Sequence, residues 1–359
     1  MLTQAIHQLV AGYSNGDAIS NETRTLRSWF RQWGFRSEIY CETARTLPDL
    51  RKDARDCSLL LEEAGPEDLV ILHLSIGSNV NDLFAKTKAK KVIRYHNVTP
   101  DRFFRAVDDH LAHLLARGRA QMKELASVAD LNLAVSGYNA KELTEVGYQN
   151  VSVVPLALEL RRLEAAPDAG ILSKYQDGKL NVLFVGRCAP NKRIEDLLYT
   201  HYYLEKFQVP ECRLIHVGSF AGTEPYLAIL KSLKRDLKLK HVDFVGSVPE
   251  SHLCAYYQVA DVFMCMSEHE GFGIPLLEAM QAQLPVMAYD SAAVAETMDG
   301  AGVLFQEKIF DELAAWTAKL GVPGALRDNV LQQQQARLQR YEDQHIETQL
   351  KRILNPLIG

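Results

Sequence analysis

The chain of 359 residues lacks the features that mark a membrane-spanning or a disulfide-stabilised protein. No window approaches the roughly 20 consecutive apolar residues that a transmembrane helix needs. A secretory signal peptide has a basic stretch followed by an apolar run, and the first eleven residues do not show this pattern. The six cysteines have no C-x-x-C spacing, which argues against both a zinc site and a disulfide framework. We therefore expect a cytoplasmic protein with reduced, buried thiols.

The composition is that of a folded protein with more than one domain. Hydrophobic residues make up 47% of the chain and charged residues 24%, and these values are close to the average for globular proteins. At roughly 150 residues per domain, the length predicts about two domains, each with a core of its own.

Positive charge is concentrated in one segment of a chain whose net charge is −5. Lys86–Lys123 contains ten lysines and arginines against three aspartates, so this segment carries +7 and the remainder −12. Such asymmetry can mark a surface that meets anionic lipid or phosphate, and solvated helix faces are the alternative. We expect peripheral contact with an anionic membrane, at its cytoplasmic face, and no nucleic-acid partner.

Short apolar runs alternate with longer amphipathic segments, which is the pattern of βα units that build a parallel sheet. The strands predicted in the first half are Ala5–Val10, Ser37–Tyr40, Asp68–Leu74, Lys91–Tyr95, Leu131–Ser136 and Val151–Pro155. Those predicted in the second half are Leu180–Val185, Arg213–Val217, Val242–Val245, Asp261–Met266, Pro285–Ala288 and Gly302–Phe305. Between the first two strands we predict a helix that Ser20 caps, with Leu26, Phe30 and Trp33 on one face.

The two sets of strands are separated by Leu156–Lys179, whose prolines and glycines are typical of a linker. We therefore predict an α/β protein with two Rossmann-like domains, residues 1–160 and 175–330, that face a cleft. The tail Val330–Leu354 is polar, with apolar residues at helical spacing. Ligands of such sheets bind beyond the carboxyl ends of the strands, so motifs in strand-to-helix turns are the candidates for chemistry.

One such turn is Ser267–Met280, S-E-H-E-G-F-G-I-P-L-L-E-A-M, which follows a predicted strand and opens a helix. Pro275 suits the first helical turn because its missing N–H would be unpaired there, and Gly271 and Gly273 let the backbone approach a ligand. Free N–H groups and the helix dipole make such a helix start an anion site.

Two carboxylates flank this helix start. Glu270 and Glu278 lie eight positions apart, so they can reach opposite ends of a ligand laid across the beginning of the helix. A carboxylate that accepts hydrogen bonds from a vicinal diol can hold a ribose or a hexose. An ordinary strand–turn–helix with surface glutamates is the alternative interpretation.

A second turn, Phe184–Arg193, reads F-V-G-R-C-A-P-N-K-R and follows another predicted strand. Arg187 and Lys192 are five positions apart on this loop, a spacing that lets both cations converge on a diphosphate. A basic loop that is merely solvated is the alternative, and the nearby pair of glutamates favours function. We expect Lys192 and Glu278 to be exposed residues of a cleft rather than core residues.

The first half contains two further candidates. Tyr13–Asn21 follows the first predicted strand, and its Gly16 permits close approach of a substrate, although a turn with a helix cap explains it equally well. Arg94–Pro100 places His96 at the carboxyl end of a strand. A structural role is the alternative for this histidine.

Together, G-R-x4-K, E-x7-E with an internal G-F-G-x-P, and H-N after a first-half strand resemble the retaining GT-B nucleotide-sugar glycosyltransferases of family 4. The motifs of the second half follow the family's order from Leu180 to Phe305, whereas the first half matches more loosely. The resemblance implies an acceptor-binding first domain, completed by a C-terminal helix at about 335–359 that crosses back to it. It implies a second domain that binds the nucleotide sugar.

The resemblance also implies roles for individual residues. The expected catalytic group is His96, Arg187, Lys192 and Glu270. The expected donor-binding group is Gly16, Gly186, Val248, Gly271, Phe272, Gly273, Ile274 and Glu278. Arg187 and Lys192 would neutralise the donor diphosphate, and Glu278 would bind the nucleotide ribose. Glu270, with the backbone after it, would hold the transferred sugar.

The resemblance implies further roles for residues of the first half and for a loop that would contact the nucleotide base. His96 would face the sugar near the reaction centre, and the loop Gly246–Val248 would contact the base. Gly16 would line the donor phosphate or the acceptor side. Many relatives carry a glycine pair where this chain has N-G-D-A, which leaves the roles of Gly16 and Asp17 open.

A leaving diphosphate must be stabilised as the anomeric carbon becomes oxocarbenium-like. The sequence has no D-x-D-type acidic pair in a context that suggests a metal. We therefore expect cationic side chains to take the place of a metal ion, and we expect no metal or other cofactor to be needed. Retention implies front-face transfer, in which a phosphate oxygen helps to deprotonate the acceptor and Glu270 only positions the sugar.

Three other activities are consistent with such a fold: a nucleotide-sugar epimerase, a sugar-phosphate-using phosphorylase and a non-catalytic nucleotide-binding subunit. The complete E-x7-E pattern and the paired cations argue against an epimerase and a non-catalytic subunit, and phosphorylases are usually much longer. We therefore expect a hexosyltransferase that acts on a glycan or lipid-linked acceptor in polysaccharide or glycoconjugate synthesis. GDP-mannose is favoured over UDP-sugars as the donor.

Overall fold

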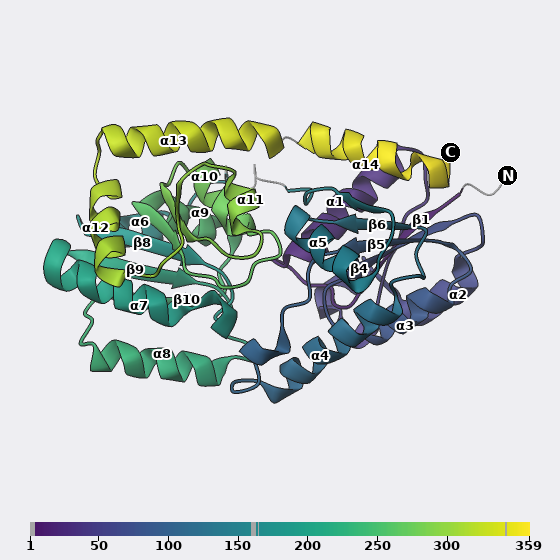
Figure 1. Ribbon diagram of the computed structural model, residues 1–359, viewed down its shortest axis with the longest axis horizontal. Helices are drawn as coiled ribbons and strands as arrows, with labels where there is room; N and C mark the ends of the chain where they lie inside the picture. Colours follow the sequence, from purple (N-terminus) through teal and green to yellow (C-terminus); the bar gives the residue numbers. More distant parts are fainter. Residues whose placement is uncertain (1–3, 159–162, 164, 342) are drawn as a thin grey trace. The chain divides into compact units, whose positions relative to one another are not determined.

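A computed structural model describes residues 4–158, 163, 165–341 and 343–359, which form two compact units (Figure 1). Unit 1 comprises Met1–Arg102, Asp109–Leu158 and Tyr341–Gly359. Unit 2 comprises Phe103–Asp108 and Glu159–Arg340. The predicted domain limit at residue 160 lies outside the described residues.

Unit 1 is built on a seven-stranded parallel sheet with the order β3-β2-β1-β4-β5-β6-β7. Its strands are β1 Ile6–Val10, β2 Ile39–Cys41, β3 Arg55–Asp56, β4 Leu69–Leu74, β5 Lys90–Tyr95, β6 Leu131–Ala134 and β7 Val151–Val153. The six predicted strands are confirmed within a few residues at each end. Among the strands of the described residues, the sequence pattern missed only the edge strand β3, because two residues show no alternation.

Helices cover both faces of this sheet, with α1 and α14 above it and α3 and α4 below it in Figure 1. The helices of unit 1 are α1 Ala18–Gln32, α2 Leu60–Glu63, α3 Asn79–Lys86, α4 Asp109–Glu124, α5 Gly137–Val146 and α14 Asp343–Ile358. Single 3-10 turns are η1 Thr43–Arg45, η2 Pro48–Leu50, η3 Cys57–Leu59 and η4 Asp101–Phe103.

The predicted cap of the first helix is wrong. Asp17, not Ser20, is the N-cap of α1, because the Asp17 carboxylate accepts the Ser20 backbone N–H at 2.8 Å. Ser20 lies inside the helix and is buried. The predicted apolar face is present, since Leu26 and Phe30 are buried.

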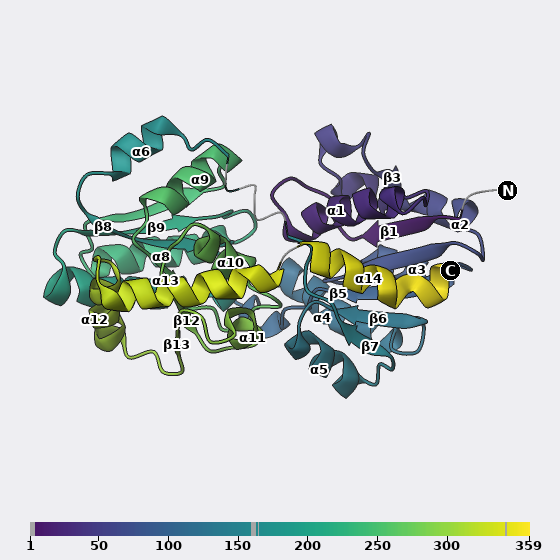
Figure 2. The same cartoon turned by 90° about the horizontal axis from the view of Figure 1, so that it is seen from above.

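The polar tail forms two helices rather than one. The first, α13 Ala325–Leu338, belongs to unit 2, and α14 belongs to unit 1. Figure 2 shows α14 lying over the sheet of unit 1. Glu347 accepts from the Trp33 indole N–H at 2.8 Å, and the Leu357 carbonyl accepts from Lys90 Nζ at 2.8 Å. The C-terminal residues are therefore an integral part of the unit that contains the N-terminal half.

Unit 2 is built on a six-stranded parallel sheet with the order β10-β9-β8-β11-β12-β13. Its strands are β8 Leu180–Val185, β9 Cys212–Val217, β10 Val242–Gly246, β11 Val262–Cys265, β12 Val286–Tyr289 and β13 Val303–Phe305. All six predicted strands are confirmed. The apolar runs were recognisable because strands of a parallel sheet are buried on both faces.

The helices of unit 2 are α6 Ala169–Tyr175, α7 Ile194–Tyr203, α8 Glu224–Asp236, α9 Glu250–Val259, α10 Ile274–Gln281, α11 Val294–Met298, α12 Phe310–Leu320 and α13. Shorter turns are η6 Pro190–Lys192, η7 Leu204–Gln208 and η8 Gln339–Tyr341. Of the predicted linker, residues 159–162 and 164 lie outside the described residues. Its later part is helical, because α6 packs into unit 2 through the buried Tyr175, whose hydroxyl donates to Asp243 at 2.9 Å.

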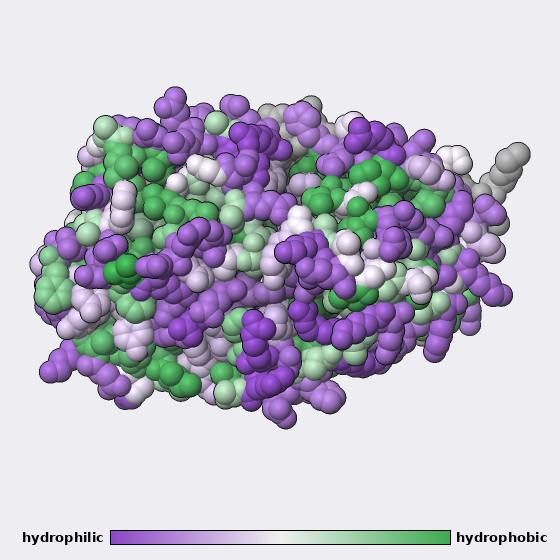
Figure 3. Space-filling view, viewed as in Figure 1, coloured by the Kyte–Doolittle hydropathy of each residue, from purple (hydrophilic) through white to green (hydrophobic). Residues whose placement is uncertain are grey.

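None of the helices that the structure describes combines the length and the apolarity that crossing a bilayer requires. Hydrophilic and apolar side chains are interspersed over the face shown in Figure 3. All six cysteines are buried free thiols, as predicted. Burial raises the pKa of the Cys188 thiol to about 12 and that of Cys265 to about 11, so both are neutral and unreactive at pH 7.

Candidate functional site

The loop after β11 turns sharply into α10, and a glycine makes the turn. Gly273 is the N-cap of α10 with φ +93°, and a Cβ there would lie 2.9 Å from Leu276 Cδ1. Thr297 Oγ1 donates to the Phe272 carbonyl, which fixes the loop from behind. No side chain caps the start of α10; Pro275 has no N–H, and the Leu276 N–H donates to the Gly273 carbonyl at 3.0 Å.

The structure brings together the two loops that the sequence singled out. They follow β8 and β11, which are adjacent in the sheet. The Asn191 amide donates to the His269 carbonyl at 3.1 Å, and the Glu268 N–H donates to the Asn191 carbonyl at 2.8 Å. Lys192 Nζ lies 2.6 Å from Glu270 Oε1. The predicted cation and the predicted sugar-binding carboxylate thus form an ion pair.

This ion pair is half-buried, with 19% of the Lys192 side chain and 13% of the Glu270 side chain exposed. Lys192 ends the 3-10 turn η6, whose Pro190 fixes the backbone entry. The Glu270 carbonyl accepts from the Ala293 N–H at 3.2 Å. Both partners are therefore held by their backbones while their charged ends remain accessible to a ligand.

Glu278 lies one turn inside α10 and is 2% exposed. The expectation that it is an exposed residue is wrong. The Tyr257 hydroxyl of α9 donates to Glu278 Oε2 at 2.8 Å, so the helix packing that buries the carboxylate also supplies a donor. Such a contact fixes the orientation of the carboxylate.

Arg187 has different partners from Lys192. One of its guanidinium nitrogens donates to the Ala221 carbonyl at 2.9 Å, and the guanidinium carbon lies 6.0 Å from the centre of the Phe104 ring. Arg187 is exposed. The two predicted cations lie on one loop, and the contacts given for the described residues include no partner that both share.

The backbone beside Arg187 is closely packed. Gly186 continues the pairing of β8 with β9 by donating to the Val217 carbonyl at 2.9 Å. A Cβ on Gly218 would lie 1.9 Å from the Gly186 carbonyl oxygen, so only glycine fits there. His216 Nε2 contacts the same carbonyl at 2.9 Å. Burial lowers the pKa of His216 to about 4, so the ring is neutral and Nε2–H is the donor.

The loop Gly246–Val248 follows β10, the edge strand of unit 2. Gly246 is buried, its carbonyl accepts from the Gly218 N–H at 2.9 Å, and Val248 is half-buried. In unit 1, Gly16 is exposed and nothing lies within 4 Å of the position that its Cβ would take. The Arg24 guanidinium donates to the Ser14 carbonyl at 3.1 Å and so supports the loop that carries Gly16.

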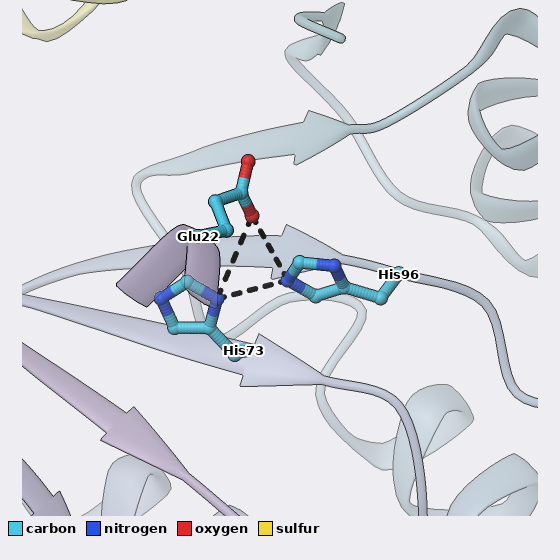
Figure 4. A group of neighbouring side chains, drawn as sticks. All are labelled: Glu22, His73 and His96. Carbon is cyan, nitrogen blue, oxygen red and sulfur yellow. Dashed lines mark hydrogen bonds and ion pairs between the residues drawn. The ribbon is translucent and has the colours of Figure 1, made fainter. Parts of the chain in front are cut away.

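His96 follows β5 in unit 1 and belongs to a buried cluster with His73 of β4 and Glu22 of α1 (Figure 4). His96 Nε2 lies 2.8 Å from His73 Nδ1 and 3.5 Å from Glu22 Oε2. Only 5% of the His96 side chain is exposed. Burial lowers the pKa of both histidines well below the usual value, and the charge of Arg94 lowers both further.

Glu22 is also half of a buried ion pair. Its Oε1 lies 2.6 Å from an Arg94 guanidinium nitrogen and accepts from the Ala157 N–H at 3.1 Å. Arg94 donates in addition to the carbonyls of Val154 and Pro155, at 2.5 and 2.8 Å. This network connects α1 and β5 with the segment that follows β7.

The basic segment Lys86–Lys123 is less available than its charge suggests. Arg94 is 2% exposed, Arg117 pairs with Asp82 at 2.9 Å, and Arg119 pairs with Glu142 at 2.6 Å. Both carboxylates lie outside the segment. The net charge of the segment therefore overstates the positive charge that is free at the surface.

Five residues with contacts in these clusters were not predicted from the sequence: Gln8, Glu22, His73, Asn191 and Tyr257. A signal existed for two of them, because His73 and Gln8 interrupt apolar strands that are otherwise buried, and a buried polar side chain requires a partner. Glu22 and Tyr257 look like ordinary helix residues, and only packing reveals their contacts.

Part of the chain matches a known family, and the whole fold matches solved structures. Residues 173–320, which include Lys192, Glu270 and Glu278, match the family model described as glycosyl transferases group 1. The crystal structure of HepE from Anabaena in complex with UDP and glucose aligns with a TM-score of 0.75 over 98% of this chain and 100% of that chain, at 16% identity. The fold is therefore GT-B, and residues 173–320 of the chain match the group 1 glycosyltransferases.

Two curated relatives match over shorter stretches. The O-antigen chain mannosyltransferase B of Escherichia coli is 29% identical over 146 residues, 40% of this chain and 38% of that protein. The GDP-mannose-dependent alpha-(1-6)-phosphatidylinositol monomannoside mannosyltransferase of Mycobacterium tuberculosis is 28% identical over 222 residues, 58% of this chain and 56% of that protein. The matches thus span about half the length of these relatives or less.

Proposed function

We propose that this chain is a retaining glycosyltransferase that moves a hexose from a nucleotide sugar to a glycan or lipid-linked acceptor. The observation that carries the proposal is the Lys192–Glu270 ion pair beside the uncapped start of α10. It combines an anion site with a carboxylate in a domain of the group 1 family. A nucleotide sugar needs both, since it contains a diphosphate joined to a polyhydroxylated ring.

The ion pair explains how the site would accept a donor. Without donor, the Lys192 ammonium and the Glu270 carboxylate neutralise each other at 2.6 Å. A diphosphate carries more negative charge than one carboxylate and would replace it as the partner of Lys192. Glu270 would then be free to accept hydrogen bonds from the hydroxyls of the sugar.

Three sources of positive charge would stabilise the leaving diphosphate: Lys192, the exposed Arg187, and the N–H groups and dipole of α10. These groups can act without a metal ion, which is why metal independence belongs to the proposal. Phosphate oxygen would assist deprotonation of the acceptor on the front face, and Glu270 would position the sugar.

Glu278 would hold the nucleotide ribose. Its carboxylate is held by the Tyr257 hydroxyl at 2.8 Å in the second turn of α10, beyond the anion site. A fixed carboxylate accepts two adjacent hydroxyls with little loss of conformational entropy. The loop Gly246–Val248 would contact the base, and His96 and Gly16 of unit 1 would serve the sugar and its surroundings.

GDP-mannose is the donor that we propose first. The mannosyltransferases of E. coli and M. tuberculosis support it, and the name of the second relative specifies GDP-mannose. Their names mention an O-antigen chain and a phosphatidylinositol monomannoside, which supports a glycan or a lipid-linked acceptor. Peripheral contact with an anionic membrane would bring the enzyme to such an acceptor.

A donor panel tests the proposal. The full chain is incubated with GDP-mannose, GDP-fucose, UDP-glucose, UDP-galactose, UDP-N-acetylglucosamine and dTDP-rhamnose, with and without EDTA, and nucleotide release is measured. We expect release from GDP-mannose that EDTA does not reduce. Release from a UDP-sugar alone would reject the donor, loss of release in EDTA would reject metal independence, and no release or binding with any donor would reject the function.

A further inference from the structure

Polar side chains are buried around His96, and hydrogen bonds join them to one another. We propose that His73 is a positioning residue that fixes the tautomer of His96, with the proton on Nε2 and the lone pair on Nδ1. The inference rests on the proposed function, because it assigns a purpose to His96 in sugar transfer.

The network begins at Gln8 of β1. The Gln8 amide nitrogen Nε2 donates to the Thr23 carbonyl at 2.9 Å, and a carbonyl can only accept. The amide oxygen Oε1 therefore faces the other way, 3.0 Å from His73 Nε2. Since that oxygen can only accept, His73 Nε2 carries a proton.

The second step follows from the neutral state of His73. The ring is fully buried and burial lowers its pKa well below the usual value, so with Nε2 protonated its Nδ1 has only a lone pair. His96 Nε2 lies 2.8 Å from this Nδ1, with the ring centres 5.1 Å apart and the planes inclined by 22°. The two rings thus meet edge to edge, and His96 Nε2 is the donor.

Glu22 completes the arrangement. Its Oε2 lies 3.5 Å from His96 Nε2 and 4.0 Å from His73 Nδ1, so the carboxylate faces the same edge of the His96 ring as His73 does (Figure 4). The charged or titratable groups around His96 are Glu22 of α1, His73 of β4 and Arg94 of β5. Because Arg94 already neutralises Glu22 at 2.6 Å, an imidazolium would have no counter-charge of its own.

The opposite edge of the His96 ring carries the nitrogen Nδ1. Within the described residues, no hydrogen bond reaches His96 Nδ1, and the network leaves this atom unprotonated. His96 can then accept a hydrogen bond from a sugar hydroxyl but cannot donate one there. A fixed lone pair selects the orientation of a hydroxyl without exchanging a proton with it.

The test is an NMR measurement on the full chain labelled with 15N in histidine, using two-bond 1H–15N correlations, which distinguish the two neutral tautomers from the imidazolium. The first variant, His73→Phe, keeps a ring but removes the acceptor. The second, His73→Asn, restores an acceptor oxygen near the position of Nδ1. Backbone spectra and thermal melts of both show whether the fold is retained.

We expect His73 and His96 to be neutral with the proton on Nε2 in the unmodified protein at pH 7. In His73→Phe, Glu22 is the remaining partner of His96 Nε2, so the imidazolium or the other tautomer should become visible. We expect kcat for transfer to fall about tenfold with little change in KM, which corresponds to one hydrogen bond. His73→Asn should restore both the spectrum and kcat.

Three results would overturn the inference: a proton on Nδ1 of His96 in the unmodified protein, an unchanged His96 spectrum in His73→Phe, or stoichiometric Zn²⁺ shifting both histidine signals reversibly with EDTA. The last would mean that Glu22, His73 and His96 serve as metal ligands. The spectra need no donor, so they are independent of the proposed function. Unchanged transfer by His96→Ala would reject its role in transfer but leave the tautomer assignment intact.

Discussion

At the scale of single residues, the site of unit 2 depends on two carboxylates in different surroundings. Glu270 is half-buried and paired with Lys192, whereas Glu278 is buried and accepts from Tyr257. A paired surface carboxylate can exchange partners, and a buried one cannot do so without loss of stability. The two residues therefore respond differently to substitution.

Replacing Lys192 should affect chemistry far more than stability. We expect Lys192→Ala to lower kcat/KM for the donor about 100-fold, because one charge that stabilises the leaving diphosphate is lost. The melting temperature should change little, since Glu270 remains partly exposed. Steady-state kinetics checks this, with the exposed Lys231→Ala as the matched control. Wild-type-like kinetics in Lys192→Ala would remove Lys192 from the mechanism.

Replacing Glu278 should affect stability as well as binding. Glu278→Ala leaves the buried Tyr257 hydroxyl without this acceptor, so we expect the free energy of unfolding to fall by about 1–3 kcal/mol. Glu278→Gln keeps an acceptor oxygen and should retain most of the stability while raising the donor KM. Urea denaturation and donor kinetics separate the two effects. If Glu278→Gln bound the donor normally, the carboxylate would have no role in binding.

At the scale of elements, the start of α10 is shaped by one backbone conformation. Gly273, the N-cap, has φ +93°, and no side chain caps the helix. From the sequence, Gly273 was interpreted as letting the backbone approach a ligand. The structure adds that this turn has a positive φ and that a Cβ there would meet Leu276.

A glycine elsewhere provides the control for this turn. An alanine in the left-handed region is disfavoured by about 1–2 kcal/mol, so both Gly273→Ala and Gly300→Ala should lower the unfolding midpoint. Gly300 has φ +79° with nothing within 4 Å of its Cβ position. We expect only Gly273→Ala to weaken donor binding, measured by calorimetry with GDP. An equal loss of GDP affinity in both variants would contradict an anion site at α10.

At the scale of the whole molecule, buried histidines make stability depend on pH. Burial lowers the pKa of His201 and of His216 from 6.5 to about 4, and it lowers the pKa of His73 and of His96 well below 6.5. Below pH 6.5 the unfolded chain binds protons that the folded chain does not, so acid favours unfolding.

We therefore expect the free energy of unfolding to be nearly constant from pH 8 to 7 and to fall from pH 6.5 toward pH 4. Each buried histidine contributes about 1.4 kcal/mol for each pH unit within that window. Urea denaturation at pH 8, 7, 6 and 5 checks the prediction. A free energy of unfolding that is higher at pH 5 than at pH 7 would contradict it.

Membrane contact is a second property of the whole molecule. Lys86 and Lys88 are exposed, whereas Lys90 donates to the Leu357 carbonyl at 2.8 Å and Arg94 is buried. We expect Lys86→Glu with Lys88→Glu to reduce binding to phosphatidylserine vesicles in a flotation assay, with Lys231→Glu as the control. Binding that is independent of anionic lipid would reject this surface.

Much of the fold was predictable because parallel strands are continuous apolar runs. All twelve predicted strands are present, and the missed β3 is a two-residue edge strand. Two local predictions were wrong. Asp17 rather than Ser20 caps α1, and part of the predicted linker is the helix α6. A single side-chain contact decides such cases, and local composition does not show it.

The sequence by itself determined the α/β class, the two sets of strands and the motifs around Lys192, Glu270 and Glu278, because these depend on local periodicity and on spacing along one turn. Only the tertiary structure decided that Lys192 pairs with Glu270, that Glu278 is buried beneath Tyr257, and that His96 is held by His73 and Glu22. These contacts join residues between 21 and 78 positions apart. Packing of the strands and helices creates them, and no local pattern encodes them.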